Sequence, residues 1–255
     1  MTIKSDVQNQ FGRNAESYVE SALHKSGKDL ATLIELTEVS GSEHALDVAT
    51  GGGHTANALA PRVGRVIAYD LTQAMLDAAK KFIRQNGHLN VDFVKGDAED
   101  MPFNNETFDI VTCRIAPHHF PNINRFIGEV YRVLKPGGQF LLDDNVAPEN
   151  NACDEFYNTI EKRRDYSHYR AWKKTEWLRM LELQGFTIQE WHRFEKTFIF
   201  DNWCERMNVP AETQRALNDD IIEAPDYIKQ KFNVMTTGNQ VRSFQGEAIV
   251  LKATK

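Results

Sequence analysis

The stretch Ala45–Ala56 reads "ALDVATGGGHTA" and joins an apolar segment to a predicted helix through three consecutive glycines. A strand that ends in a glycine-rich turn before a helix lets a ligand approach the backbone closely. Gly51, Gly53 and Ala56 also satisfy the short G-x-G-x-x-G/A pattern of dinucleotide-binding domains. The stretch therefore predicts a ligand site on an α/β fold and leaves the identity of the ligand open.

Short apolar runs and helix-like segments alternate after this stretch. The apolar runs are "HALDVA", "RVIAYD", "VDFV", "FDIVTC" and "GQFLLDD". Helix-like segments lie between them at 54–62, 72–86 and 121–134. Near-continuous apolar strands that alternate with helices are typical of a parallel sheet covered on both faces. Two later runs, near 186–200 and 246–252, are predicted to complete the sheet.

The chain has no Pro-, Gly- or Ser-rich linker, so we predict a single domain over residues 1–255. Residues 1–40 are predicted to form an N-terminal helical cover, and 41–144 the ligand-binding core. Residues 145–255 are predicted to add helices that cover the substrate, together with the final strands. All four tryptophans fall in this last part.

Composition excludes several classes of function. The net charge of −6 argues against nucleic acid as a partner, because such binders usually carry a basic surplus. No apolar run reaches the roughly 20 residues that span a bilayer, and no secretory signal precedes the first helix. The three cysteines form no C-x-x-C pair, which fits a reducing compartment and predicts no metal site. We expect a cytoplasmic protein.

Acidic residues follow successive predicted strands, at Asp47, Asp70 and Asp97. A carboxylate beside the glycine loop disfavours a pyrophosphate and favours a ligand that carries positive charge. Asp70, seventeen residues past Gly53, suits the hydroxyls of a ribose. Asp97 suits an adenine amino group. Each of the last two could instead cap a helix or stabilise a turn.

With these motifs in order, the chain resembles the class I S-adenosylmethionine-dependent methyltransferases, and within them the branch of ubiquinone/menaquinone-biosynthesis C-methyltransferases. The likeness runs from about Phe11 to Asp144 and rests on "DVATGGG", "YDLTQAML", "GDAEDMPF", "FDIVTCRIAPHHF" and "RVLKPGG". Ala49 stands where the family usually has its first glycine. The resemblance implies an α/β, Rossmann-like three-layer sandwich around a mainly parallel seven-stranded sheet whose last strand is antiparallel.

The resemblance also implies which residues hold S-adenosyl-L-methionine. "FGRNAESYV" resembles the segment that folds over the methionine end of this cofactor. The residues implied to bind it are Tyr18, Gly51, Gly52, Gly53, Asp70, Leu71, Met75, Asp97 and Ala98. Met75 could equally belong to the core.

Two further residues follow the fourth predicted strand. Arg114 is expected near the cofactor by the strand-end rule, with a structural ion pair as the alternative. His119 is expected to be the catalytic residue of the pocket, because the resembling branch commonly has a histidine there. It is a candidate general base, although the sulfonium is already an activated methyl donor and exclusion of water can supply much of the rate.

The sequence thus predicts methyl transfer from S-adenosyl-L-methionine to a small, partly apolar acceptor. Two alternatives stay open: a cofactor-binding protein without turnover, and a dinucleotide-dependent oxidoreductase. The run "EKRRDYSHYR" is most simply a solvated helix face, and alternatively a charged rim for the acceptor. No motif selects among carbon, oxygen and nitrogen as the methylated atom.

Overall fold

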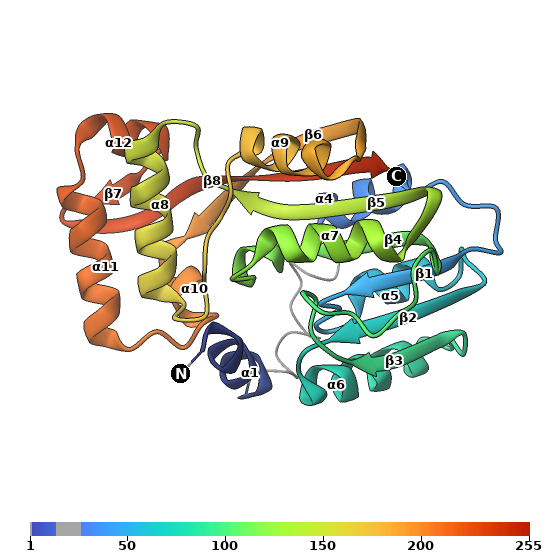
Figure 1. Ribbon diagram of the computed structural model, residues 1–255. Helices are drawn as coiled ribbons and strands as arrows, with labels where there is room; N and C mark the ends of the chain where they lie inside the picture. The colour runs from blue at the N-terminus through green and yellow to red at the C-terminus, as the bar shows by residue number, and fades with distance from the viewer. Residues whose placement is uncertain (1, 14–26) are drawn as a thin grey trace.

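The computed structural model describes residues 2–13 and 27–255 (Figure 1). Its helices are α1 (Ile3–Arg13), α4 (Lys28–Leu36), α5 (His54–Leu59), α6 (Gln73–Gln85), α7 (Ile123–Val133), α8 (Asn151–Arg164), α9 (Lys174–Gln184), α10 (Phe200–Glu205), α11 (Ala211–Glu223) and α12 (Asp226–Lys231), with a short 3₁₀ turn η1 (Pro117–His119). Its strands are β1 (His44–Val48), β2 (Arg65–Asp70), β3 (Val91–Lys95), β4 (Phe108–Arg114), β5 (Leu134–Val146), β6 (Thr187–Ile199), β7 (Met235–Thr237) and β8 (Gln240–Thr254).

The strands form one sheet in the order β3-β2-β1-β4-β5-β8-β6, and β7 pairs with β8 beside this path. Strands β1 to β5 are parallel, whereas β8 runs antiparallel to both β5 and β6. The Rossmann-like, mainly parallel sheet with an antiparallel final strand is confirmed. The short strand β7 adds an eighth member that the sequence pattern did not predict, and β8 begins at Gln240 rather than near 246.

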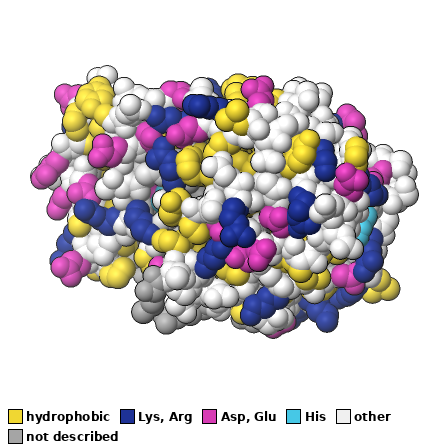
Figure 2. Space-filling model, in the orientation of Figure 1, with side chains coloured by type: hydrophobic (Ala, Val, Ile, Leu, Met, Phe, Trp, Pro, Cys, Tyr) yellow, Lys and Arg dark blue, Asp and Glu magenta, His cyan; other side chains and the backbone are white. Residues whose placement is uncertain are grey.

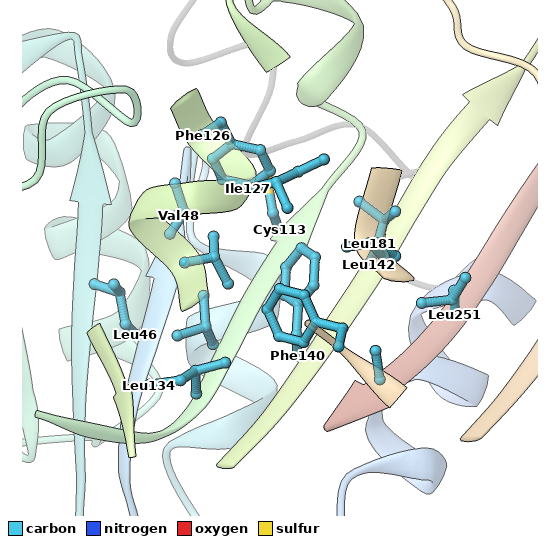
Figure 3. Close-up of a cluster of buried hydrophobic side chains, with 14 of the residues drawn as sticks. Leu46, Val48, Cys113, Phe126, Ile127, Leu134, Phe140, Leu142, Leu181 and Leu251 are labelled. Atoms are coloured by element: carbon cyan, nitrogen blue, oxygen red, sulfur yellow. The ribbon is translucent and has the colours of Figure 1, made fainter. Parts of the chain in front are cut away.

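The two faces of the sheet bury side chains of different size. On β1 and β2, Ala45, Val66 and Ala68 pack toward α4, α5 and α6. Leu46, Val48 and Tyr69 pack into the opposite cluster, which α7 and α9 cover. Figure 3 shows this second cluster, which includes Phe126 and Ile127 of α7 and Phe140 and Leu142 of β5. Both faces of the central strands are therefore buried, as near-continuous apolar runs require.

A third apolar cluster lies beyond the end of the parallel strands. Helices α8, α10, α11 and α12 pack there with the first half of β8, at the left of Figure 1. Trp203 and Phe244 meet in its core with ring centroids 5.0 Å apart. Strand β8 continues from this cluster into the main sheet. The organisation as a single domain stays a prediction, which limited proteolysis would test.

Candidate active site

A cavity of about 130 Å³ opens where the parallel strands end. The glycine loop, the segments that follow β2 and β3, and the exit of β4 form its walls, and α1 contributes Lys4, Val7 and Phe11. Eight of the residues predicted to bind the cofactor line it: Gly51, Gly52, Asp70, Leu71, Met75, Asp97, Ala98 and Arg114. Ligands of open α/β sheets bind at this edge. Their role toward the cofactor stays a prediction.

Asp47 holds the glycine loop in place. Its Oδ2 accepts hydrogen bonds from the hydroxyl of Thr50 (2.6 Å) and the backbone N–H of Ala56 (3.1 Å), and its Oδ1 accepts one from the hydroxyl of Thr112 (2.8 Å). Burial raises the pKa of Asp47 to about 6 in spite of these bonds. The sequence argument gave this carboxylate a purely electrostatic role, and the structure adds that it connects the loop, α5 and β4.

The loop requires backbone conformations that glycine adopts readily. Gly51 has a φ of +52° and Gly53 a φ of +82°, and Ala49 lies at +53° where the family usually has glycine. A Cβ atom at Gly53 would lie 2.9 Å from the Cβ of Ala79 on α6. Gly53 was predicted to bind the cofactor, but it does not line the cavity. The structure instead explains this glycine by the close approach of α6.

Asp70 lies at the end of β2 and faces the cavity from the base of the loop. Its carboxylate accepts hydrogen bonds from the backbone N–H groups of Gly51 (2.9 Å) and Thr72 (2.8 Å). Burial raises its pKa above the usual value, which these two bonds counteract. Each carboxylate oxygen has two lone pairs, so Asp70 can still accept hydrogen bonds from two hydroxyl groups of a ligand.

Asp97 is paired with a residue from the other end of the sequence. The ammonium of Lys4 lies 2.6 Å from Oδ2 of Asp97 and 2.6 Å from Oε2 of Glu99. Sequence reasoning missed Lys4, because no local pattern marks a lysine that is ninety-three residues away from its partner. Asp97 therefore binds α1 across the cavity.

Arg114 belongs to a buried group of charges. Its guanidinium lies 3.0 Å from Asp29 on α4 and 3.0 Å from Asp143 on β5, and Lys196 on β6 lies 3.7 Å from the same Asp29 oxygen. Burial raises the pKa of Asp143 to about 7. Burial also opposes ionisation of Asp29, but Arg114 and Lys196 outweigh it and lower its pKa to about 2. Arg114 thus has the structural ion pairs that the sequence left as an alternative, while it lines the cavity.

The charges around this cavity suit a ligand without phosphate. Among the described residues that line it, the carboxylates belong to Asp47, Asp70, Asp97 and Glu99. The lysine and the arginine in this described lining, Lys4 and Arg114, both form ion pairs with carboxylates. A pyrophosphate would meet mainly negative charge here, whereas a ribose, an adenine amino group and a sulfonium would not.

A second cavity of about 840 Å³ adjoins the first. Glu161, Arg164, Asp165 and His168 line it, so four members of the "EKRRDYSHYR" run face a cavity. Tyr157, Phe194 and Phe198 add aromatic surface. Phe11, Ile115 and His119 line both cavities. Ile115 has a φ of +51°, which is a strained backbone conformation for a β-branched residue. Residues with such strained backbones are concentrated at functional sites.

The adjacent histidines differ in their partners. Nδ1 of His118 lies 2.5 Å from Oδ1 of the buried Asp144. Nδ1 of His119 lies 3.0 Å from the carbonyl oxygen of Ser167, and its ring meets that of Phe11 edge to face at 5.0 Å. Burial and the neighbouring His118 lower the pKa of His119. His119 therefore lies at the junction of the cavities, where its catalytic role stays a prediction.

The remaining expectations concern Tyr18, metal binding, membrane spans and surface charge. Tyr18, predicted to contact the methionine end of the cofactor, lies outside the described residues. Among residues 2–13 and 27–255, no group of three or more His, Cys, Asp and Glu side chains is arranged to hold a metal ion. No helix in these same ranges has the length and apolar character needed to cross a membrane. Charged side chains of both signs are interspersed on the face shown in Figure 2.

Comparison with known proteins identifies the family. Residues 46–142 match the model of a methyltransferase domain. An uncharacterized methyltransferase of Bacillus subtilis (strain 168) is 35% identical over 246 residues, which cover 96% of this chain and 97% of that protein. The chain belongs to the class I S-adenosylmethionine-dependent methyltransferases.

Two further relatives agree with this assignment. The crystal structure of a provisionally named methyltransferase from Bacillus halodurans C-125 matches this fold with a TM-score of 0.88. The two sequences are 57% identical, and the match covers 90% of this chain and 99% of that chain. A ubiquinone/menaquinone biosynthesis C-methyltransferase of Rickettsia prowazekii (strain Madrid E) is 30% identical over 164 residues, or 59% of this chain and 65% of that protein. The protein is thus a methyltransferase whose cosubstrate is S-adenosylmethionine, and not an oxidoreductase.

Proposed function

We propose that this methyltransferase binds S-adenosylmethionine in the 130 Å³ cavity and methylates a small, partly apolar molecule in the 840 Å³ cavity. One observation carries the proposal. The two cavities meet at Phe11, Ile115 and His119, at the exit of β4. A methyl group at this junction would be accessible from both sides, as transfer between two bound molecules requires.

The residues of the first cavity can be assigned to parts of the cofactor. Asp70 would accept hydrogen bonds from the ribose hydroxyls, and Asp97 one from the adenine amino group. Leu71, Met75 and Ala98 would contact the adenosine, while Gly51 and Gly52 allow close approach of the backbone. The bound cofactor supplies an activated methyl group on a sulfonium. Tyr18 remains our proposed contact to its methionine end.

The second cavity suits an acceptor with both aromatic and polar parts. Tyr157 and Phe198 offer aromatic contacts, and Arg164 and Asp165 offer charged ones. His119 would contact the acceptor and the methyl group at the junction. A named relative acts in ubiquinone/menaquinone biosynthesis. Quinone precursors therefore head the acceptors that we would test, followed by phenols and amines.

Replacement of Asp70 by asparagine tests the cofactor site. Loss of a charge-assisted hydrogen bond costs about 1.5–3 kcal/mol, so the affinity for S-adenosylmethionine should fall roughly 10- to 100-fold in calorimetric titration. Asp92→Asn, on the exposed part of β3, is the matched control and should bind like the wild type. If folded Asp70→Asn kept wild-type affinity, the assignment of the first cavity would be wrong.

Incorporation of labelled methyl groups tests the acceptor. Wild-type protein with methyl-labelled S-adenosylmethionine should modify at least one quinone precursor, phenol or amine. Phe198→Trp, which narrows the second cavity, should reduce this incorporation and leave cofactor affinity unchanged. If cofactor affinity changed and incorporation did not, the acceptor would have to bind elsewhere.

A further inference from the structure

His118, which lines the second cavity, forms a buried pair with Asp144. His118 lies in η1, directly after β4, and Asp144 near the end of β5, with Nδ1 and Oδ1 2.5 Å apart. The backbone carbonyl of His118 also accepts hydrogen bonds from the N–H groups of Tyr169 (2.8 Å) and Arg170 (2.9 Å). Backbone hydrogen bonds therefore hold the main chain of His118, and Asp144 orients its imidazole.

The partner of Nδ1 assigns the proton on the ring. A carboxylate can only accept hydrogen bonds, and Oδ1 of Asp144 already accepts one from the N–H of Asn145 at 2.9 Å. Nδ1 of a neutral His118 therefore carries the hydrogen, and Nε2 carries the lone pair. No described residue forms a hydrogen bond with Nε2, and His118 lines the second cavity but not the first. A proton acceptor thus lies where the methyl acceptor would bind.

The surroundings favour protonation of His118 over that of the two other described histidines near it, His119 and His168. Burial alone would lower its pKa, but the Asp144 carboxylate outweighs burial and raises the pKa above its usual value. Burial lowers the pKa of both His119 and His168. The charged and titratable groups that face His118 are Asp144 on β5, Glu161 and Asp165 at the end of α8, His119 in η1, and His168, whose ring centroid is 5.6 Å away.

We propose that His118 is the general base of the methyl transfer, that Asp144 is its positioning residue, and that the acceptor carries a phenolic or enolic hydroxyl group. The proposal rests on the proposed function of the two cavities. The hydroxyl proton moves to Nε2 of His118, and the acceptor oxygen, or a carbon conjugated with it, forms the bond to the methyl group. The electron pair of the broken carbon–sulfur bond stays on sulfur, so the products are methylated acceptor, S-adenosylhomocysteine and protonated His118.

A hydroxyl acceptor explains the pair better than an amine does. A weakly basic amine, such as an aromatic amine, is already neutral at pH 7 with a free lone pair and needs no base before it attacks. A phenol or enol attacks far better as its anion, so it benefits from a base beside the reacting atom. His119, without a carboxylate partner among the described residues and with a lowered pKa, is poorly suited to this step.

The activity test uses phenols of graded acidity as probes, with methyl-labelled S-adenosylmethionine. His118→Gln should lose at least 100-fold in kcat/KM with 4-methoxyphenol, the range of a lost general base. The loss should be much smaller with 4-nitrophenol, which is largely ionised at pH 8. Affinity for S-adenosylmethionine should stay within twofold. His192→Gln, which removes an exposed histidine that pairs with Glu190, is the matched control.

A second readout does not depend on turnover. Nitrogen-15 NMR of the wild type should show His118 with a protonated Nδ1 and an unprotonated Nε2 at pH 8. Asp144→Asn should lower the pKa of His118 by at least one unit and shift the pH profile of kcat toward lower pH. The opposite tautomer, or an unchanged pKa in Asp144→Asn, would overturn the role of the pair.

The outcomes separate the proposals from each other. If the wild type does not bind S-adenosylmethionine, the proposed function fails first. If it binds the cofactor and methylates amines but neither phenols nor enolisable ketones, the assigned acceptor class is wrong. If His118→Gln loses the same factor with every phenol, or loses nothing, His118 is not the base while the assignment of the cavities remains.

Discussion

The ammonium of Lys4 lies 2.6 Å from a carboxylate oxygen of Asp97 and 2.6 Å from one of Glu99, so α1 is bound across the cofactor cavity. The Glu99 carboxylate also accepts a hydrogen bond from the N–H of Asn122 at 2.6 Å, which connects α1 to the start of α7. Because α1 forms a wall of the cavity, we expect the cofactor to pass α1 when it enters and leaves.

Loss of this ion pair should therefore speed cofactor release. Lys4 and Asp97 are each about one-third exposed, so the pair contributes at most about 1 kcal/mol, and Lys4→Met should raise the dissociation rate by no more than about fivefold. Stopped-flow measurement of S-adenosylhomocysteine release tests this, with Lys80→Met on the exposed face of α6 as the control. Slower release from Lys4→Met would mean that Lys4 competes with the cofactor for Asp97.

Replacement by alanine should mainly reduce stability at Gly53 and mainly reduce cofactor affinity at Gly51. Gly53→Ala would place a Cβ atom 2.9 Å from that of Ala79 at a φ of +82°, and should cost about 2–4 kcal/mol of stability. Gly51→Ala meets no atom closer than 3.9 Å and should cost about 1 kcal/mol. Gly51 lines the cavity, so we expect its added methyl group to reduce the affinity for the cofactor at least tenfold. Chemical denaturation and calorimetry measure both effects, and the reverse pattern would refute the explanation.

Asp47 should make stability depend on pH. Its pKa is raised from 3.8 to about 6 by burial, so the folded protein binds the proton more tightly than the unfolded chain. The stabilisation that results from this pKa difference is fully present below pH 4 and is lost as the pH rises through about 6. Asparagine cannot ionise, so the free energy of unfolding of Asp47→Asn, relative to wild type, should rise by about 2 kcal/mol between pH 4.5 and 7.5.

Urea unfolding at the two pH values measures this difference. Asp77→Asn, which changes an exposed carboxylate on α6, should show a constant difference from wild type. A difference for Asp47→Asn that stayed constant or fell toward pH 7.5 would show that burial does not govern this carboxyl group.

Replacement of Arg114 should reduce the stability of the fold more than it reduces the affinity for the cofactor. Arg114→Met would leave Asp29 and Asp143 buried beside Lys196, which lies 3.7 Å from Asp29. Removal of one member of a buried ion pair typically costs about 3–5 kcal/mol. The double change Arg114→Met with Asp143→Asn should recover part of this loss in thermal unfolding. A stable Arg114→Met protein that failed to bind S-adenosylmethionine would make Arg114 mainly a cofactor residue.

The sequence predicted those parts of the site that depend on local patterns. The apolar run before Asp47 and the glycines after it placed a loop at a strand end, and the carboxylates of Asp70 and Asp97 line the same cavity because parallel strands end at one edge. Gly53 fits the motif, but its reason is a tertiary contact with Ala79. No local sequence pattern could distinguish a glycine that contacts the cofactor from one that is required by the close approach of α6.

Partners that are distant in sequence could not be predicted. The folded sheet brings Lys4 to Asp97, and His118 to Asp144 twenty-six residues later. The sequence drew attention to the adjacent histidines but not to the carboxylate behind the first of them. Short elements were also missed: α10 has six residues and β7 has three, too few for a periodic pattern.

The central claim is that the methyl group of the cofactor lies where the two cavities meet. NMR with S-adenosylmethionine that carries a carbon-13 label in its methyl group tests this claim most directly. We predict nuclear Overhauser contacts from this methyl group to the ring protons of Phe11 and His119 and to the side chain of Ile115. Contacts to Leu71 and Met75 in their place would put the methyl group at the wrong end of the first cavity and would contradict the account.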